Sequence, residues 1–227
     1  MDKKRDYIQE IVAKRGRLSS KGTRLSHFAA RTYPIDKGAR FLANKTTQAE
    51  DFRGEYLKYL PIGYIAAFES YLRLAIRDLI DFGPPFSENA RGFQDFKFQI
   101  ETVLAITAKR TSVGEFIAHL LPIRNLRDIS SAMSVLIGED FLKRLRITKL
   151  SVIQGSEQET LERLYDPNIF AAVEDVFLLR HMFCHEFATT ETIGEKRLWH
   201  STRGVFMFVL ATESLLNELN VISTMRE

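Results

Sequence analysis

Apolar residues recur along most of the chain at the spacing of a helix, three or four positions apart. The clearest stripe has steps of three and four residues, which place all of its members on one helical face: Ile65, Phe68, Leu72, Ile76 and Leu79. Gly and Pro residues separate such stretches from one another. The pattern predicts an all-α fold, an antiparallel helical bundle with additional helices around it.

Turn residues set the bounds of the helices that we expect. These helices are 2–15, 47–81 with a break near Pro61, 93–109, 113–121, 125–137, 139–146, 157–164, 168–192 and 196–220. Ser112 and Glu115 have the spacing of a capping box, which predicts the start of the helix at 113. A brief extended piece at 150–155 has no evident partner strand. We expect one helical domain over 48–227, in which 93–155 is a candidate helical insertion.

The first 47 residues differ from the rest in pattern and in charge. After a short amphipathic helix, small, basic and turn residues dominate, so we predict an irregular basic arm over 1–47. Residues 1–45 hold 12 Lys or Arg against 4 Asp or Glu, and the remainder of the chain holds 20 against 25. Since Lys and Arg bind phosphates regardless of base sequence, this distribution favours a polyanionic partner such as RNA. A tail that only keeps the chain soluble is an equally open interpretation.

The composition limits the class of protein. No apolar run reaches the length of a bilayer span, and the charged N-terminus has no signal-peptide region, so we expect no membrane partner. Cys184 is the single cysteine, which excludes an internal disulfide and a cysteine-based zinc site. Such cysteine usage fits a reducing compartment. We therefore expect a cytoplasmic protein.

One expected helix, 168–192, carries charged residues in the middle of an apolar sequence. At about 100° per residue, Glu174, His181 and His185 fall on one side of this helix as a polar notch, roughly 100–140° from Arg180. Apolar residues surround Arg180 itself. An arginine on an apolar face is costly unless a negative group lies close to it. The pattern therefore indicates a functional site.

Arg180, four further residues and then His185 form an Arg-x4-His motif, and in this the sequence resembles the HEPN superfamily. His181 stands where the family often has a polar residue, and Glu69 is our candidate for an acid that the family commonly carries on an earlier helix. The resemblance covers about 64–220. It implies an all-α, dimeric, metal-independent RNA endonuclease of the kind found in toxin–antitoxin and abortive-infection defence systems. It also implies an antitoxin or an activating partner.

The candidate residues suit RNA cleavage without a cofactor, because RNA carries its own nucleophile, the 2′-hydroxyl. His185 is the candidate for acid–base catalysis, since imidazole titrates near neutral pH. Arg180 offers a planar fork of donors to a phosphate that becomes more negative in the transition state. His181 is the candidate second proton-transfer or substrate-positioning group. Glu174 in the same helix and Glu69 across helices are the candidate orienting acids.

The spacing of the motif also predicts the oligomeric state. Arg180 and His185 lie about 140° apart around one helix and roughly 7–8 Å apart along its axis. A single copy of the helix therefore does not aim both groups at one phosphate. A two-fold homodimer can place both arginines and both histidines around a shared cleft. We expect a homodimer with a composite active site.

Three other interpretations stay open. His181 and His185, four residues apart, form a two-point set of metal ligands that Glu174 or Glu69 could extend. Arg180 and one of these acids could instead form a purely structural buried ion pair. The whole chain could be a non-catalytic HEPN-like module that binds a nucleotide, RNA or a protein partner. RNA cleavage in the presence of EDTA distinguishes these interpretations.

Overall fold

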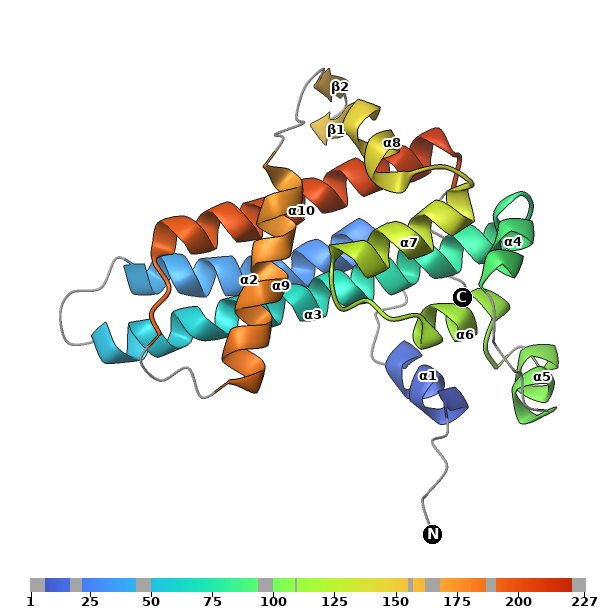
Figure 1. The fold of residues 1–227 in the computed structure, drawn as a ribbon, viewed down its shortest axis with the longest axis horizontal. Helices are drawn as coiled ribbons and strands as arrows, with labels where there is room; N and C mark the ends of the chain where they lie inside the picture. Colours follow the sequence, from blue (N-terminus) through green and yellow to red (C-terminus); the bar gives the residue numbers. More distant parts are fainter. Residues whose placement is uncertain are drawn as a thin grey trace, which may run out of the picture.

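The computed structural model describes residues 7–16, 22–43, 50–93, 100–108, 110–154, 157–161, 168–186 and 191–221. Its longest helix is α3 (Glu50–Phe82), and α2 (Arg24–Ala43) and α10 (Glu195–Glu218) lie alongside it (Figure 1). A fourth helix, α9 (Ile169–His185), crosses α10 and α3 and packs against both. The prediction of an all-α fold is confirmed.

Shorter elements cover the rest of the bundle (Figure 1). They are α1 (Tyr7–Arg15), α4 (Phe86–Asn89), the 3-10 turn η2 (Ala90–Gly92), α5 (Ile100–Thr107), α6 (Val113–Leu120), α7 (Leu126–Ile137) and α8 (Phe141–Ile147). Two short strands, β1 (Leu150–Gln154) and β2 (Glu157–Leu161), form an antiparallel hairpin. Within the described residues, no helix combines the length and the apolar character needed to cross a membrane.

The long helices run in mixed directions. Arg24 pairs with Asp78, and Tyr64 donates a hydrogen bond to Asp36, so α2 and α3 are antiparallel. The hydroxyl of Tyr71 on α3 donates to the backbone carbonyl of Val209 on α10, at 3.3 Å. Seven residues earlier on both helices, Tyr64 is hydrogen-bonded to Thr202. The helices α3 and α10 therefore run in the same direction.

Aromatic side chains fill the centre of the bundle. Phe68 on α3 is fully buried, and its ring centroid lies 5.5 Å from that of Phe208 on α10 and 6.2 Å from that of Phe177 on α9. Phe141 and Phe170 pack around the ring of Phe208 with edge-to-face geometry. Burying such rings is among the largest favourable terms in folding. This cluster joins the motif helix α9 to the two long helices beneath it.

The N-terminal region is helical where the structure describes it, so the predicted irregular arm is wrong for α2. One face of α2 is buried through Arg24, Phe28, Thr32 and Ala39. Two polar residues in this row interrupt the apolar stripe, which is why the periodicity did not predict the helix. Pro34 lies inside α2 and also argued for extended backbone.

The short helix that we expected near the N-terminus is present as α1. Its buried residues, Ile8 and Ile11, pack with Ala105 and Phe116 in a small cluster apart from the main core. Arg15 pairs with Glu115 of α6. The helix is therefore docked on α6 by a small apolar contact and an ion pair.

Contrary to our expectation of a break, α3 continues through Pro61. A proline inside a helix removes one backbone hydrogen bond and costs about 3 kcal/mol or more. Leu57 and Leu60 before it, and Ile65 and Phe68 after it, are all buried. Packing on both sides of the proline therefore offsets its cost, which the local sequence does not reveal.

The expected short helix at 157–164 is also wrong, because residues 157–161 form strand β2. In the hairpin, Leu150 lies opposite Leu161 and Gln154 opposite Glu157. Leu150 is buried, and β1 packs against α10. Strand β1, which packs on α10, offers its backbone groups to β2 for hydrogen bonding. Because residues 157–161 have no apolar stripe that would favour a helix, this pairing determines their structure.

The helix that carries the motif ends earlier than predicted, at His185 instead of Thr192. The next residue, Glu186, has extended backbone with φ −113° and ψ 147°. Residues 189, 190 and 192 are threonines, whose branched side chains disfavour helix. Residues 187–190 lie outside the described part, so the expectation for them is not assessed.

The middle of the chain belongs to the main core. Ile117 of α6, Ile129 of α7 and Phe141 of α8 are all buried in it. The capping box is present, with the Glu115 N–H donating to the Ser112 hydroxyl at 3.0 Å and the Ser112 N–H to the Glu115 carboxylate at 3.2 Å. The helices expected at 125–137 and 139–146 are confirmed within two residues. Of the helix expected at 93–109, the structure shows α5, and residues 94–99 and 109 lie outside the described part. An insertion over 93–155 stays a prediction.

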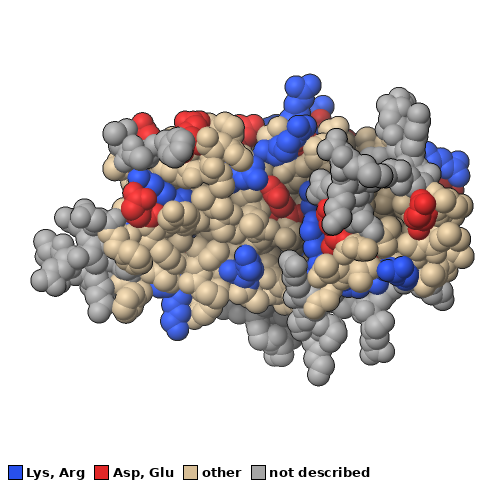
Figure 2. Space-filling view, turned by 90° about the horizontal axis from the view of Figure 1, so that it is seen from below, with Lys and Arg blue, Asp and Glu red and all other residues tan. Residues whose placement is uncertain are grey.

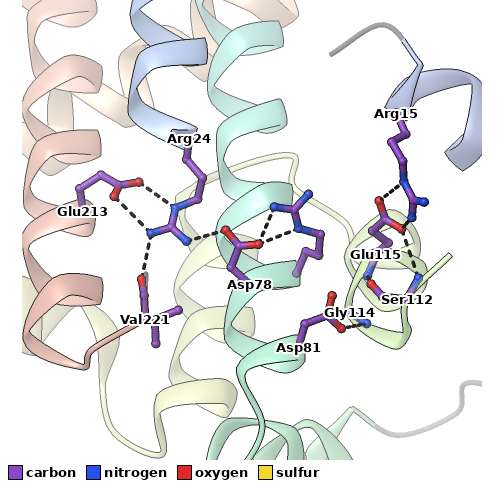
Figure 3. A network of polar contacts seen from close by, with 10 residues as sticks. Arg15, Arg24, Asp78, Asp81, Ser112, Gly114, Glu115, Glu213 and Val221 are labelled. Carbon is purple, nitrogen blue, oxygen red and sulfur yellow. Dashed lines mark hydrogen bonds and ion pairs between the residues drawn. The ribbon is translucent and has the colours of Figure 1, made fainter. Parts of the chain in front are cut away.

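A buried ionic network ties the ends of three helices together (Figure 3). Arg24 at the start of α2 is bonded to Asp78 on α3 at 2.6 Å and to both carboxylate oxygens of Glu213 on α10 at 2.9 and 3.2 Å. It also donates to the backbone carbonyl of Val221 at 3.2 Å. Burial alone would lower the pKa of Arg24, but Glu213 and Asp78 outweigh it and raise the pKa. Arg24 is therefore a fully buried cation held by two carboxylates.

Removing the guanidinium should leave two buried carboxylates without their partner. We expect Arg24→Met to lower the free energy of unfolding by about 3–5 kcal/mol, measured by urea denaturation. Arg31→Met is the matched control on the same helix, since Arg31 is exposed, and it should change the value by less than about 0.5 kcal/mol.

A second variant separates the charge effect from lost packing. Replacing all three groups, Arg24→Met with Asp78→Leu and Glu213→Leu, removes the unpaired carboxylates as well and should restore part of the lost stability. If the single and triple variants unfold at the wild-type urea concentration, the network does not hold the helices together.

Candidate functional site

Helix α9 is held in place by close packing against α10. A Cβ atom on Gly204 would lie 2.3 Å from the Cβ of Ala172, so only glycine permits this approach. Beside this contact, both nitrogens of the Arg197 fork donate to the Asp175 carboxylate, and the Ser201 hydroxyl donates to it at 2.6 Å. The crossing fixes which side of α9 faces the core and which side remains exposed.

Arg180 lies on α9 beyond the core and is half-buried. Among the described residues, its guanidinium forms no hydrogen bond and no ion pair within 4.0 Å. The positive charge of Arg180 acts on the carboxyl of Glu69 on α3, where it opposes the rise in pKa that burial causes. The donor fork of Arg180 is therefore not occupied by a carboxylate, which favours a ligand-binding role over the purely structural ion pair.

Glu69 is the acid that the fold brings to Arg180. It is half-buried on α3, and burial raises the pKa of its carboxyl above the ordinary 4.5. The positive charges of Arg180, Arg73 and Lys14 oppose this rise. The structure thus joins two sequence candidates from helices far apart in the chain. Arg73 and Lys14 were not among our candidates, because neither belongs to a motif.

The two histidines of the motif lie together on the exposed side of α9. The ring centroids of His181 and His185 are 5.3 Å apart, with an angle of 49° between the ring planes. The Nε2 atom of His181 lies 3.9 Å from a carboxylate oxygen of Glu186, and both side chains are exposed. His185 is exposed and has no hydrogen-bond partner within the described part of the chain. The four-residue spacing therefore brings the two imidazoles together. Among the described residues, however, no buried carboxylate is hydrogen-bonded to either ring to orient it.

Glu174 does not join this group in the structure. It is exposed on α9 and forms no hydrogen bond or ion pair with either histidine or with Arg180 among the described residues. It shares an exposed row of α9 with the histidines and with Leu178, which is 57% exposed. The predicted orienting role of Glu174 has no contact to support it.

A metal site would need a third ligand beside the two histidines. Within the described ranges, no group of three or more His, Cys, Asp or Glu side chains is arranged to hold a metal ion. Cys184 is exposed and unpaired with another cysteine. The histidine pair alone supplies two points of attachment, whereas zinc usually has at least three protein ligands.

Comparison with known proteins gives this chain no relatives: no family model, no curated protein and no solved structure matches it.

The raised pKa of Glu69 predicts a pH dependence of stability. The folded protein holds the proton of Glu69 more tightly than the unfolded chain, so this stabilisation is present below about pH 4.5 and is lost as the pH rises through the folded-state pKa. We therefore expect the stability of the wild type to decline relative to Glu69→Gln as the pH rises from 4.5. Urea unfolding of both proteins over this range measures the difference.

Glu101→Gln is the control for this comparison, because Glu101 is exposed on α5 and lies outside the site. A constant difference between wild type and Glu69→Gln at every pH would contradict the burial of the Glu69 carboxyl.

Proposed function

We propose that the protein is a metal-independent endoribonuclease that cleaves RNA by attack of its 2′-hydroxyl group. The observation that carries the proposal is the half-buried Arg180, whose donor fork has no partner in the described part of the chain, close to two adjacent exposed imidazoles. An arginine fork without a carboxylate is suited to a phosphate. The imidazoles of His181 and His185 are suited to proton transfer at accessible positions.

Each group has a defined task in the cleavage. A base takes the proton from the 2′-hydroxyl, which then attacks the adjacent phosphorus. An acid gives a proton to the departing 5′-oxygen, so the products are a 2′,3′-cyclic phosphate and a free 5′-hydroxyl. His185 and His181 are assigned these two proton transfers. Arg180 stabilises the additional negative charge on the phosphate in the transition state, and Glu69 on α3 supports Arg180 through its negative charge.

The exposed row on α9 supports the composite dimeric site. Ala171, Glu174, Leu178, His181 and His185 are all exposed along one side of this helix. An exposed leucine between charged and imidazole groups is suited to burial in an interface. Packing this row against its two-fold copy brings four imidazoles together and places both arginines at the edges of the same cleft.

The cellular role rests on the resemblance to HEPN nucleases. An endonuclease without base-specific contacts needs restraint in its own cell, so we propose a defence effector or toxin controlled by an antitoxin or an activating partner. A basic N-terminal region with 12 Lys or Arg in 45 residues is compatible with an RNA substrate.

A second candidate function has an observation in its favour. Neither imidazole has a hydrogen bond to a buried acid within the described residues, and such a bond usually orients a catalytic histidine. A non-catalytic module that binds a nucleotide, RNA or a protein through the same surface would have no need of one. Cleavage measured in EDTA distinguishes the two functions.

Substitution of the motif residues tests the nuclease directly. We expect His185→Ala and Arg180→Ala each to lower RNA cleavage by about 10²-fold or more, since general acid–base and electrostatic terms have this size. A fluorescent RNA substrate in EDTA reports the rate. His200→Ala and Arg127→Ala are the matched controls, because both residues are exposed on other helices.

The unfolding free energy of each motif variant should be measured beside its cleavage rate, to separate loss of catalysis from loss of folding. Arg180→Ala should lose less than about 1 kcal/mol of unfolding free energy, because it has no ion pair to break. Full cleavage activity in both motif variants would refute the assignment. A loss of about 3 kcal/mol or more would instead support a structural role for Arg180.

The shared site is tested by mixing subunits. Light scattering should give a mass of about twice 26.1 kDa for the wild type. When inactive His185→Ala protein is mixed in excess with wild type and subunits exchange, activity should fall faster than the wild-type fraction, because heterodimers lack a complete cleft. Activity in strict proportion to the wild-type fraction, or full activity in a monomer, would exclude a composite site.

A further inference from the structure

A cavity of about 500 Å³ lies between α1, α2, α3 and α6. Arg73 lines the cavity, and its charge also interacts with Glu69, one of the candidate residues of the nuclease site. The volume is that of a site for a small organic ligand. None of the cavity residues belongs to the Arg-x4-His motif.

Basic side chains outnumber acidic ones in the lining. Among the described residues that line the cavity, one is a carboxylate, Glu115, and six are cationic: Lys14, Arg15, Arg24, Arg31, Arg73 and Arg77. Arg15, Arg24 and Arg77 are each paired with a carboxylate, so the charge that can attract an anion comes chiefly from the others. Figure 2 shows that lysine and arginine side chains are interspersed with carboxylates on the face of the molecule that it draws.

Several of these cations have structural partners that fix their positions. Arg15 is paired with Glu115, as Figure 3 shows, and Arg24 is held by its two carboxylates. Arg73 donates to the backbone carbonyls of Ala118, His119 and Leu121, at the end of α6. These bonds hold the positive groups around the cavity without filling it.

Two polar groups in the lining lack a partner. Arg31 is exposed at the cavity and forms no hydrogen bond or ion pair among the described residues. The Nε2 atom of His27, one turn earlier on α2, is buried and also has no hydrogen-bond partner there. A buried polar atom without a partner is rare in folded proteins, so this nitrogen is available for a hydrogen bond with a ligand. Arg31 and His27 lie on the same side of α2.

The rest of the lining is apolar and partly aromatic. Phe28 and Tyr71 lie in the lining but are only 2% and 1% exposed, so the accessible apolar surface comes from Ala66 and Leu74. This surface suits a flat, weakly polar body, and the cations suit a phosphate. An inorganic phosphate would leave most of the volume empty, whereas an RNA strand would need a groove that the docked α1 helix covers.

We propose that this cavity binds a nucleoside 5′-phosphate, with the phosphate at Arg31 and the base against the accessible apolar surface of Ala66 and Leu74. The Nε2 atom of His27 completes its hydrogen bonding with the ligand. The site goes beyond the proposed nuclease function and does not depend on it, because binding is measured without any RNA cleavage.

Isothermal titration of the full-length protein with AMP, GMP, CMP and UMP tests the proposal. At least one of them should bind with one molecule per chain and at least about tenfold more tightly than inorganic phosphate or its own nucleoside. Arg31→Gln should weaken this binding about tenfold or more, through loss of a charged hydrogen-bond donor. Arg127→Gln, an exposed arginine on α7, is the matched control and should bind as wild type does.

A second variant fills the cavity instead of changing its charge. Ala66 lines the cavity at an exposed position, so Ala66→Phe should block binding while the protein stays folded. Ala30→Phe, at an exposed position of α2 outside the described lining, is its control. The proposal is overturned if none of the four nucleotides binds, if Arg31→Gln and Arg127→Gln bind equally, or if only a 5′-phosphorylated RNA binds.

Discussion

The arrangement of the helices depends on a single buried cation. Arg24 joins the start of α2 to α3 and to α10 through Asp78 and Glu213, and it also binds the carbonyl of Val221 after α10. A buried guanidinium is tolerated only when its donors are satisfied, so the three helix ends are fixed at the distances that these bonds require. The aromatic core around Phe68 stabilises the bundle by hydrophobic burial, which is non-directional, whereas the hydrogen bonds of this network require one alignment of the helices.

The alignment determines what the motif helix can do. Because α3 and α10 are fixed side by side, α9 crosses them in one orientation, which Gly204 and the bonds to Asp175 hold. This orientation buries one side of α9, leaves Arg180 half-buried near Glu69, and exposes both imidazoles. The nuclease proposal therefore rests on a site whose arginine is half-buried and whose histidines are exposed, where a second subunit would complete it.

Charge links this site to the cavity beneath α1. The charges of Arg180 and of Arg73, which lines the cavity, both act on the half-buried carboxyl of Glu69. A phosphate in the cavity would alter the field at Glu69 and hence at Arg180, which gives a physical route by which a nucleotide could affect the motif helix. The helix α1 is held on α6 beside the cavity by a small apolar contact and by the ion pair between Arg15 and Glu115.

Local sequence patterns were sufficient to predict the fold class and the helices that have strong apolar stripes or caps. They also predicted that the two motif histidines lie on one side of a helix. These features depend on local spacing, which the helical repeat converts directly into geometry. Tertiary structure alone explains three elements: helix α2, the continuation of α3 through Pro61, and strand β2. In each of them, packing or strand pairing outweighs a weak or contrary local preference. Three features depend on residues that are far apart in the chain: the buried ion pairs of Arg24, the effect of Arg180 on Glu69, and the basic lining of the cavity. A local sequence pattern cannot predict such contacts.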